Sequence, residues 1–219
     1  FLVIGIFFYG SLTYAVQQAG YVPQGNDTLG LLAVMMMFFI PALTTRLLAE
    51  EQRLGTIELL LTAPVRDWEL VVGKWLGVFM LLLTIIAFTL VYPLILNGLV
   101  EPGIDWGPLI SGYLGAILLC AAFAGLGVLS SSLFSNQIAA FIFTMGLFVF
   151  VWWIIGPIVQ IVGQTGAGSN LINYLDFNQH YTTNLIRGVI DLSDVVYFVS
   201  VTALSLFLSS VWIEMRRWR

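Results

Sequence analysis

The chain has few charged residues and almost no residues that bind metals through nitrogen or sulfur. Only 9% of its 219 residues are charged, whereas a soluble domain carries about 25%. One cysteine, Cys120, and one histidine, His180, are too few for a disulfide or a His/Cys metal cluster within the chain. We therefore expect no metal site, and we expect Cys120, which lies in an apolar segment, to be a small packing residue.

The chain also lacks the usual sequence signals for nucleotides and nucleic acids. Gly73-Lys74 is the only Gly-Lys pair, and Trp68 and Trp75 occupy the positions where a phosphate-binding loop needs a glycine and a serine or threonine. No basic surface interleaved with aromatic residues is present to favour a nucleic-acid partner. We expect no catalytic residues and no cofactor bound by this chain.

Apolar residues dominate what is present. They make up 59% of the chain, and the mean hydropathy is +0.97. Since a spanning helix needs about 20 apolar residues, the sequence predicts an all-α polytopic membrane protein with six transmembrane helices in a single domain, residues 1–219. The predicted spans are roughly 1–16, 29–48, 70–96, 108–133, 138–162 and 195–213. Because Phe1 lies within an apolar run, we interpret the first span as truncated and an N-terminal segment as missing.

The distribution of charge predicts the orientation. Seven of the eight basic residues fall on one side of the six-span arrangement: Arg46, Arg53, Arg66, Lys74, Arg216, Arg217 and Arg219. The positive-inside rule makes this side cytoplasmic, together with both termini. The other side carries Arg187 and several carboxylates, including Asp191 and Asp194, which suits the outside of a bacterial inner membrane. Carboxylates are missing from the centres of the predicted spans, which argues against a proton or cation relay.

The second connection has the pattern of an amphipathic helix. Polar residues 50–53 precede Leu54, Ile57 and Leu61, which recur at helical spacing. Such a helix would lie flat at the cytoplasmic surface. Two interpretations are open: the helix only anchors the bundle at the interface, or its polar face binds a cytoplasmic partner.

Several motifs of the chain resemble one known family. They are AEEQRLGTIELLLTAPV with the following VVGKWLG, then GYLGAILLCAAFAGLGVLSSSLFSNQIAA, and finally HYTTNLIRGVIDLSDVVYFVS with the closing EMRRWR. This pattern resembles the permease subunits of ABC-2-type transporters, in particular the branch of the gliding-motility permease GldF, and it is close to the permeases associated with copper-enzyme maturation. The resemblance covers nearly all of the chain.

The resemblance implies a membrane domain that works as a dimer with two separate ABC ATPase subunits. ATP and Mg would bind the partner ATPase, and the other partners would be a second permease chain, identical or related, and membrane lipid. The second connection would be the coupling helix, and transfer by matching positions gives these ATPase-contact candidates: Glu50, Glu51, Arg53, Gly55, Thr56, Glu58 and Leu59. A second cytoplasmic contact would be the turn 132–137, with Ser135, Asn136 and Gln137.

The stretch from Gly163 to Asp194 is too long for a simple turn. Its apolar residues suggest short helices, which by resemblance would be half-embedded external helices at the outer mouth of the pathway, before the last span. These helices either contact substrate or only brace the bundle. Asn173, Asp176 and His180 are the candidates for an external gate.

Three functions are compatible with these observations. The first is an ATP-driven permease, with export favoured by the family resemblance. The second is a non-transporting membrane scaffold, or a force- or signal-transmitting partner of an ATPase in an envelope or motility machine. The third, an ion-coupled transporter or channel, needs buried ionisable groups or a polar filter, and the sequence pattern indicates neither. The residues do not select a substrate.

Overall fold

The structure is a computed structural model, and it describes residues 2–17, 26–55, 66–100, 103–162 and 174–217. All regular elements within these ranges are helical, as predicted. Five helices are long and apolar enough to cross a membrane: 28–54, 67–99, 106–133, 137–158 and 192–215. They correspond to the last five predicted spans. The first predicted span forms a shorter apolar helix.

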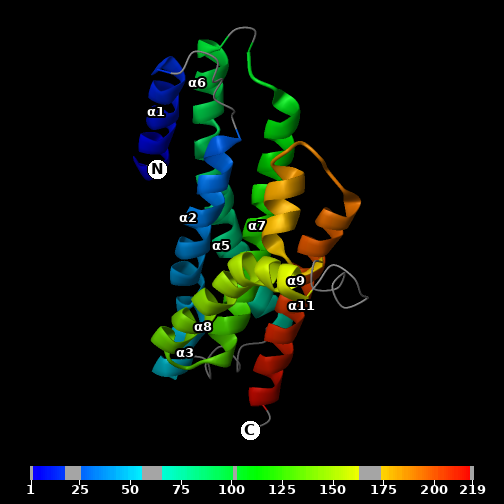
Figure 1. The fold of residues 1–219 in the computed structure, drawn as a ribbon. Coiled ribbons are helices and arrows are strands. Elements are labelled where there is room, and N and C mark those ends of the chain that lie inside the picture. Colours follow the sequence, from blue (N-terminus) through cyan, green and yellow to red (C-terminus); the bar gives the residue numbers. More distant parts are fainter. Residues whose placement is uncertain (1, 18–25, 56–65, 101–102, 163–173, 218–219) are drawn as a thin grey trace.

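The helices follow the predicted spans but are more finely divided. In chain order they are α1 (Leu2–Gln17), α2 (Asp27–Thr44), α3 (Arg46–Leu54), α5 (Asp67–Thr89), α6 (Val91–Leu99), α7 (Trp106–Leu133), α8 (Gln137–Val149), η1 (Phe150–Ile154), α9 (Ile155–Val162), η2 (Gln179–Leu185) and α11 (Leu192–Arg217). Single residues, Thr45 and Leu90, separate α2 from α3 and α5 from α6. Figure 1 shows α3, the start of α5 and the end of α11 at one end of the bundle.

Helix α7 is the centre of the bundle. It packs against α2, α5, α8, α11 and η2, and most of its residues are buried, including Cys120 as expected. Its sequence is rich in glycine, alanine and serine, which let neighbouring backbones approach closely. Large apolar side chains such as Met80, Phe88 and Phe207 are instead exposed on the outer helices. This distribution suits a bundle whose solvent is lipid.

Two glycines of α7 mark the closest approaches. A Cβ on Gly127 would lie 2.1 Å from Oγ1 and 2.7 Å from Cβ of Thr44 on α2. A Cβ on Gly112 would lie 2.5 Å from Cδ1 of Leu29, also on α2. The absence of side chains at these positions therefore sets how closely α2 packs against α7.

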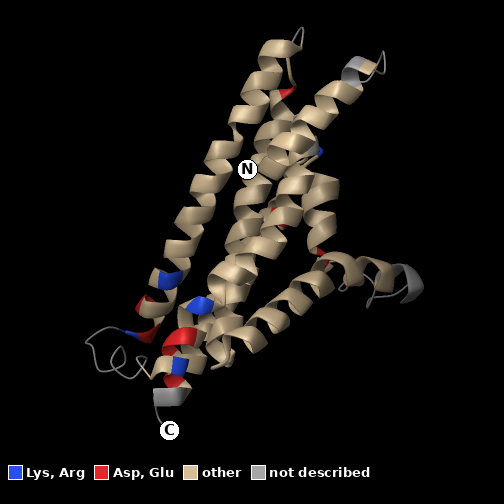
Figure 2. Ribbon diagram, turned by 90° about the vertical axis from the view of Figure 1, so that its left-hand side faces the viewer, with Lys and Arg blue, Asp and Glu red and all other residues tan. Residues whose placement is uncertain are grey.

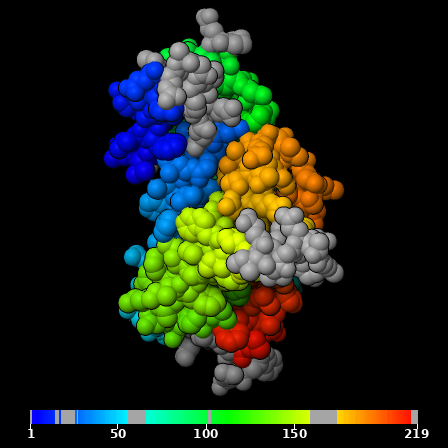
Figure 3. Space-filling model, viewed as in Figure 1, coloured from blue at the N-terminus to red at the C-terminus, as the bar shows by residue number. Residues whose placement is uncertain are grey.

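The predicted fifth span, 138–162, forms the inclined segment α8–η1–α9. In Figures 1 and 2 it rises from the lower end of the bundle and ends at about half the bundle's height. In the face seen in Figure 3 this segment covers the lower part, and residues around 174–190 lie above it. Trp152 is buried and packs against Phe123, whereas Trp153 is exposed. The described part of the external stretch therefore lies along the bundle, not on top of it.

The contact at Gly127 predicts a specific destabilisation. Gly127→Ala places a methyl group on Thr44, so we expect the free energy of unfolding to fall by about 1–3 kcal/mol, the usual cost of overpacking. The measurement is thermal unfolding in one detergent. Gly146→Ala on α8 is the matched control, because its Cβ would meet nothing within 4 Å. Equal unfolding temperatures for the two variants would contradict the close approach of α7 and α2.

Candidate functional site

Helix α3 is amphipathic and shorter than the predicted coupling helix. Leu48 and Ala49 are buried, whereas Arg53 and Leu54 are exposed. The helix ends because Gly55 adopts a left-handed conformation, φ 71°, which only glycine adopts at little cost. The prediction of one helix running from Leu54 through 57 and 61 is therefore wrong, since Gly55 interrupts it. The candidates at 56, 58 and 59, namely Thr56, Glu58 and Leu59, lie outside the described residues.

A serine of α7 holds the start of α3. The Oγ atom of Ser131 accepts hydrogen bonds from the backbone N–H groups of Leu48 and Ala49, each at 3.0 Å. The same hydroxyl donates to the carbonyl oxygen of Thr45 at 3.0 Å. One turn further along α3, the Gln52 side-chain amide donates to the carbonyl oxygen of Ser132 at 3.0 Å. Helix α3 is thus fastened to the last turn of α7.

The ATPase-contact candidates that the structure describes differ in their exposure and in their contacts. Glu51 pairs with Lys74 on α5, with 2.6 Å between Oε1 and Nζ, and both side chains are partly buried. Glu51 therefore braces α3 against α5. Glu50 is half-buried, whereas Arg53 and Gly55 are exposed. Arg53 is consequently the charged candidate that is most accessible to a partner.

The second predicted contact lies at the same end of the bundle. Ser135 and Asn136 are exposed in the turn between α7 and α8, and Gln137 begins α8. The side chain of Asn136 caps α8, because its Oδ1 accepts from the Ile138 N–H at 2.9 Å. Helix α3 packs against both α7 and α8. We call α3 together with the turn 134–137 the α3 end, and Figure 2 shows charged residues gathered at this end.

The described external residues, 174–191, are tied to the bundle by polar contacts. The Ser111 hydroxyl on α7 donates to the carbonyl oxygen of Leu185 at 2.8 Å. The Tyr181 hydroxyl donates to the carbonyl oxygen of Leu29 on α2 at 3.2 Å. Tyr181 and Leu185 are fully buried. The prediction of a short helix in this stretch is confirmed at Gln179–Leu185, which forms η2, whereas its external position stays a prediction.

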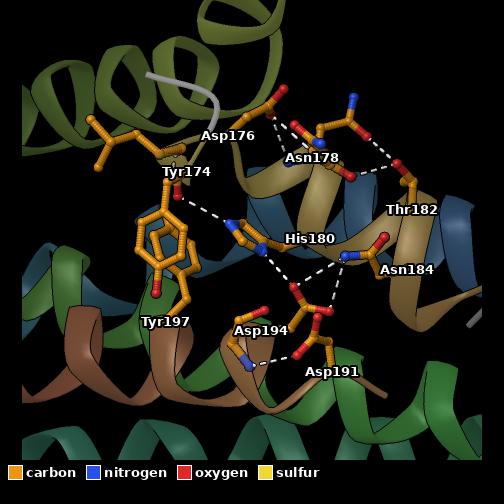
Figure 4. Close-up of polar contacts among 12 residues, drawn as sticks. Tyr174, Asp176, Asn178, His180, Thr182, Asn184, Asp191, Asp194 and Tyr197 are labelled. Atoms are coloured by element: carbon orange, nitrogen blue, oxygen red, sulfur yellow. Dashed lines mark hydrogen bonds and ion pairs between the residues drawn. The ribbon is translucent and has the colours of Figure 1, made fainter. Parts of the chain in front are cut away.

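Two of the three external-gate candidates are buried, and the third, Asn173, lies outside the described residues. Oδ1 of Asp176 accepts from the N–H groups of Asn178 and Gln179 at 2.9 and 3.4 Å. Burial raises the pKa of the Asp176 carboxyl above its ordinary range, and these N–H groups partly offset the rise. His180 lies beside Asp194 on α11, with 2.5 Å between Nδ1 and Oδ1 (Figure 4).

The sequence suggested that Asp194 lies on an acidic outer surface, but the structure buries it. It is fully buried in the first turn of α11, and the start of α11 lies well below the upper ends of α6 and α7 (Figure 1). Asp194 is thus a buried carboxylate at the start of a helix, not at the centre of a span, so it does not contradict the expectation that the span centres lack carboxylates. An available signal was the position of Asp194 within the first residues of an apolar run. Its partner His180 lies across a turn, and sequence periodicity does not reveal such a pairing.

The fastening of α3 predicts the effect of removing one hydroxyl. Ser131→Ala leaves the Leu48 and Ala49 N–H groups without this acceptor, so we expect their amide hydrogen exchange to accelerate, by the equivalent of about 1–3 kcal/mol. The neighbouring Ser130→Ala is the matched control, because the Ser130 hydroxyl bonds only Leu126 of its own helix. Similar exchange at both amides in the two variants would contradict the role of Ser131.

Comparison with known proteins agrees with the arrangement of spans. A family described as "ABC-2 family transporter protein" matches residues 8–215. No curated protein matches the chain. The match covers nearly the whole described bundle, including the α3 end and the external residues. Together with five helices of spanning length, it makes the chain a multi-pass membrane protein and a transport component, and the chain belongs to the ABC-2 transporter family.

Proposed function

We propose that this permease subunit exports its substrate with energy from a separate ABC ATPase that docks on the α3 end. Arg53 and Leu54 are exposed at the tip of α3, while the opposite face of the helix is buried against the bundle. A short, rigid helix with one exposed end is suited to fit a cleft of a soluble partner. The observation that carries the proposal is the fastening of this exposed helix to α7 through Ser131.

Docking on α3 would move several spans together. Ser131 joins α3 to α7, and the Glu51–Lys74 pair joins α3 to α5. Helix α7 in turn packs against α2, α5 and α11. Closure of the ATPase around its nucleotide would therefore displace α3 and α7 as one body. The spans around them would repack, because a packed core changes between discrete arrangements and does not deform continuously.

The remaining parts of the transporter follow from this assignment. ATP and Mg bind the ATPase, a second permease chain completes the pathway, and lipid surrounds the pair. The α3 end lies at the end of the bundle where most of the basic residues gather, and it faces the cytoplasm of a bacterial cell, with both termini of the permease on that side of the inner membrane. The motif from 49 to 77 supports placement in the gliding-motility permease branch. Asp176 and His180, together with Asn173, belong to the external gate.

Charge reversal on the exposed end of α3 tests this proposal. In Arg53→Glu we expect binding of the cognate ATPase to weaken at least about tenfold, roughly 1.4 kcal/mol. The reason is that a charge pair that attracts in the wild type becomes a pair that repels in the variant. The measurement is the dissociation constant of the ATPase and the full-length permease in lipid nanodiscs, together with the rate of ATP hydrolysis.

Arg53→Lys is the matched control, because it keeps the positive charge and the exposure and changes only the shape of the head group. We expect it to retain most of the binding and most of the stimulated hydrolysis. Wild-type affinity in Arg53→Glu would place the docking surface elsewhere on the permease.

A further inference from the structure

A histidine and a carboxylate are buried together where the external residues meet α11. Nδ1 of His180 lies 2.5 Å from Oδ1 of Asp194, and the exposed fractions of the two side chains are 9% and 0%. Both residues lie in a bundle of spanning helices, where ionisable groups are costly unless they are paired. None of the packing described above requires ionisable side chains at these two positions. The pair therefore needs a separate explanation.

The hydrogen bonds around the ring determine how many protons it carries. Nε2 of His180 lies 3.0 Å from the carbonyl oxygen of Tyr174, which can only accept a hydrogen bond. The Asn184 side-chain amide donates to both oxygens of Asp194, at 3.2 and 3.1 Å. Both carboxylate oxygens thus act as acceptors, as in the ionised form. Each ring nitrogen therefore faces an oxygen that can accept a hydrogen bond (Figure 4), an arrangement that fits a ring with a proton on both nitrogens.

The surroundings of the ring favour a cation. The ring of Tyr197 on α11 stacks on His180 with 4.3 Å between centroids and 20° between planes, and an aromatic face attracts a positive charge. The ring of Tyr174 approaches edge-on. Within the described residues, no lysine or arginine forms an ion pair with Asp194. His180 is thus the cation that balances this carboxylate.

Two further carboxylates act on the ring. Asp176 is buried on the same segment, and burial raises its pKa. Asp191 is exposed at the turn before α11, and its pKa is lowered by hydrogen bonds from Ser193. An ionised Asp191 also favours the charged ring, but from solvent and at a greater distance. Asp194 is the carboxylate in direct contact with the ring.

We propose that His180 and Asp194 form a buried binding site for one proton, and that this proton fastens the external residues 174–185 to α11. Loss of the proton would leave a ring lone pair facing either the Asp194 carboxylate or the Tyr174 carbonyl oxygen. Either arrangement is repulsive and buried, so the external residues would separate from α11. Proton occupancy therefore sets how firmly residues 174–185 are held against α11. None of the residues of this site belongs to the α3 end.

The direct test is the protonation state of His180 at neutral pH, where an ordinary exposed histidine is largely neutral. The measurement is nitrogen NMR of full-length protein that carries ¹⁵N-histidine and no histidine tag, with His180→Gln to assign the signal. We expect both ring nitrogens to be protonated in the wild type. A neutral, single-tautomer ring in the wild type would overturn the proposal, whatever the variants do.

Two variants that replace a carboxylate with a carboxamide distinguish the carboxylate in contact with the His180 ring from one that is only near it. Asp194→Asn should convert His180 to a neutral ring, and amide exchange across 179–188 should accelerate by about tenfold or more, the usual effect of losing a charge-assisted hydrogen bond. Asp191→Asn is the matched control, because it removes a nearby carboxylate that does not touch the ring, and its effect on both readouts should be far smaller than that of Asp194→Asn. A still-protonated ring or unchanged exchange in Asp194→Asn would overturn the proposal.

Discussion

The close packing of neighbouring helices against α7 is the constraint on which the rest of the structure depends. In lipid, apolar helices gain little from burying one another, so association relies on close contact and on buried hydrogen bonds. Gly127 brings α2 against α7, and Ser131, one turn later, fastens the α3 that follows α2. The same helix binds the external residues through Ser111. One central helix thus connects the two ends of the bundle.

This connection gives a mechanical account of the two polar regions. At the α3 end the polar contacts join α3 to α7 and α5, and they leave Arg53 exposed. Where residues 174–185 meet α11 the polar groups are buried, and Asp194 is enclosed by His180 and Asn184. A soluble partner can therefore reach the first region, whereas the second is enclosed by its neighbours. Both regions reach α7 through short hydrogen bonds, so a change in either alters the same helix.

Much of the fold could be predicted from the sequence, because apolar length determines where a helix can span. The predicted span 108–133 corresponds to α7, Trp106–Leu133, whereas the orientation inferred from the basic residues stays a prediction. The failures have local or long-range causes. Gly55 ends α3 by adopting a left-handed conformation, which the spacing of apolar residues does not predict. The inclination of α8–η1–α9 depends on packing and not on hydropathy. Ser131 and Asp194 acquire their roles from residues that only the folded chain brings near.

The central claim is that the ATPase binds this permease at α3. The most direct measurement is photo-crosslinking in nanodiscs, with a photoreactive residue placed in the full-length permease at Arg53 or at Trp106, which is exposed at the opposite end of the bundle, where α7 begins. The account predicts a crosslink to the ATPase from position 53 and none from position 106. A crosslink from 106, or none from 53 in a complex that hydrolyses ATP, would contradict it.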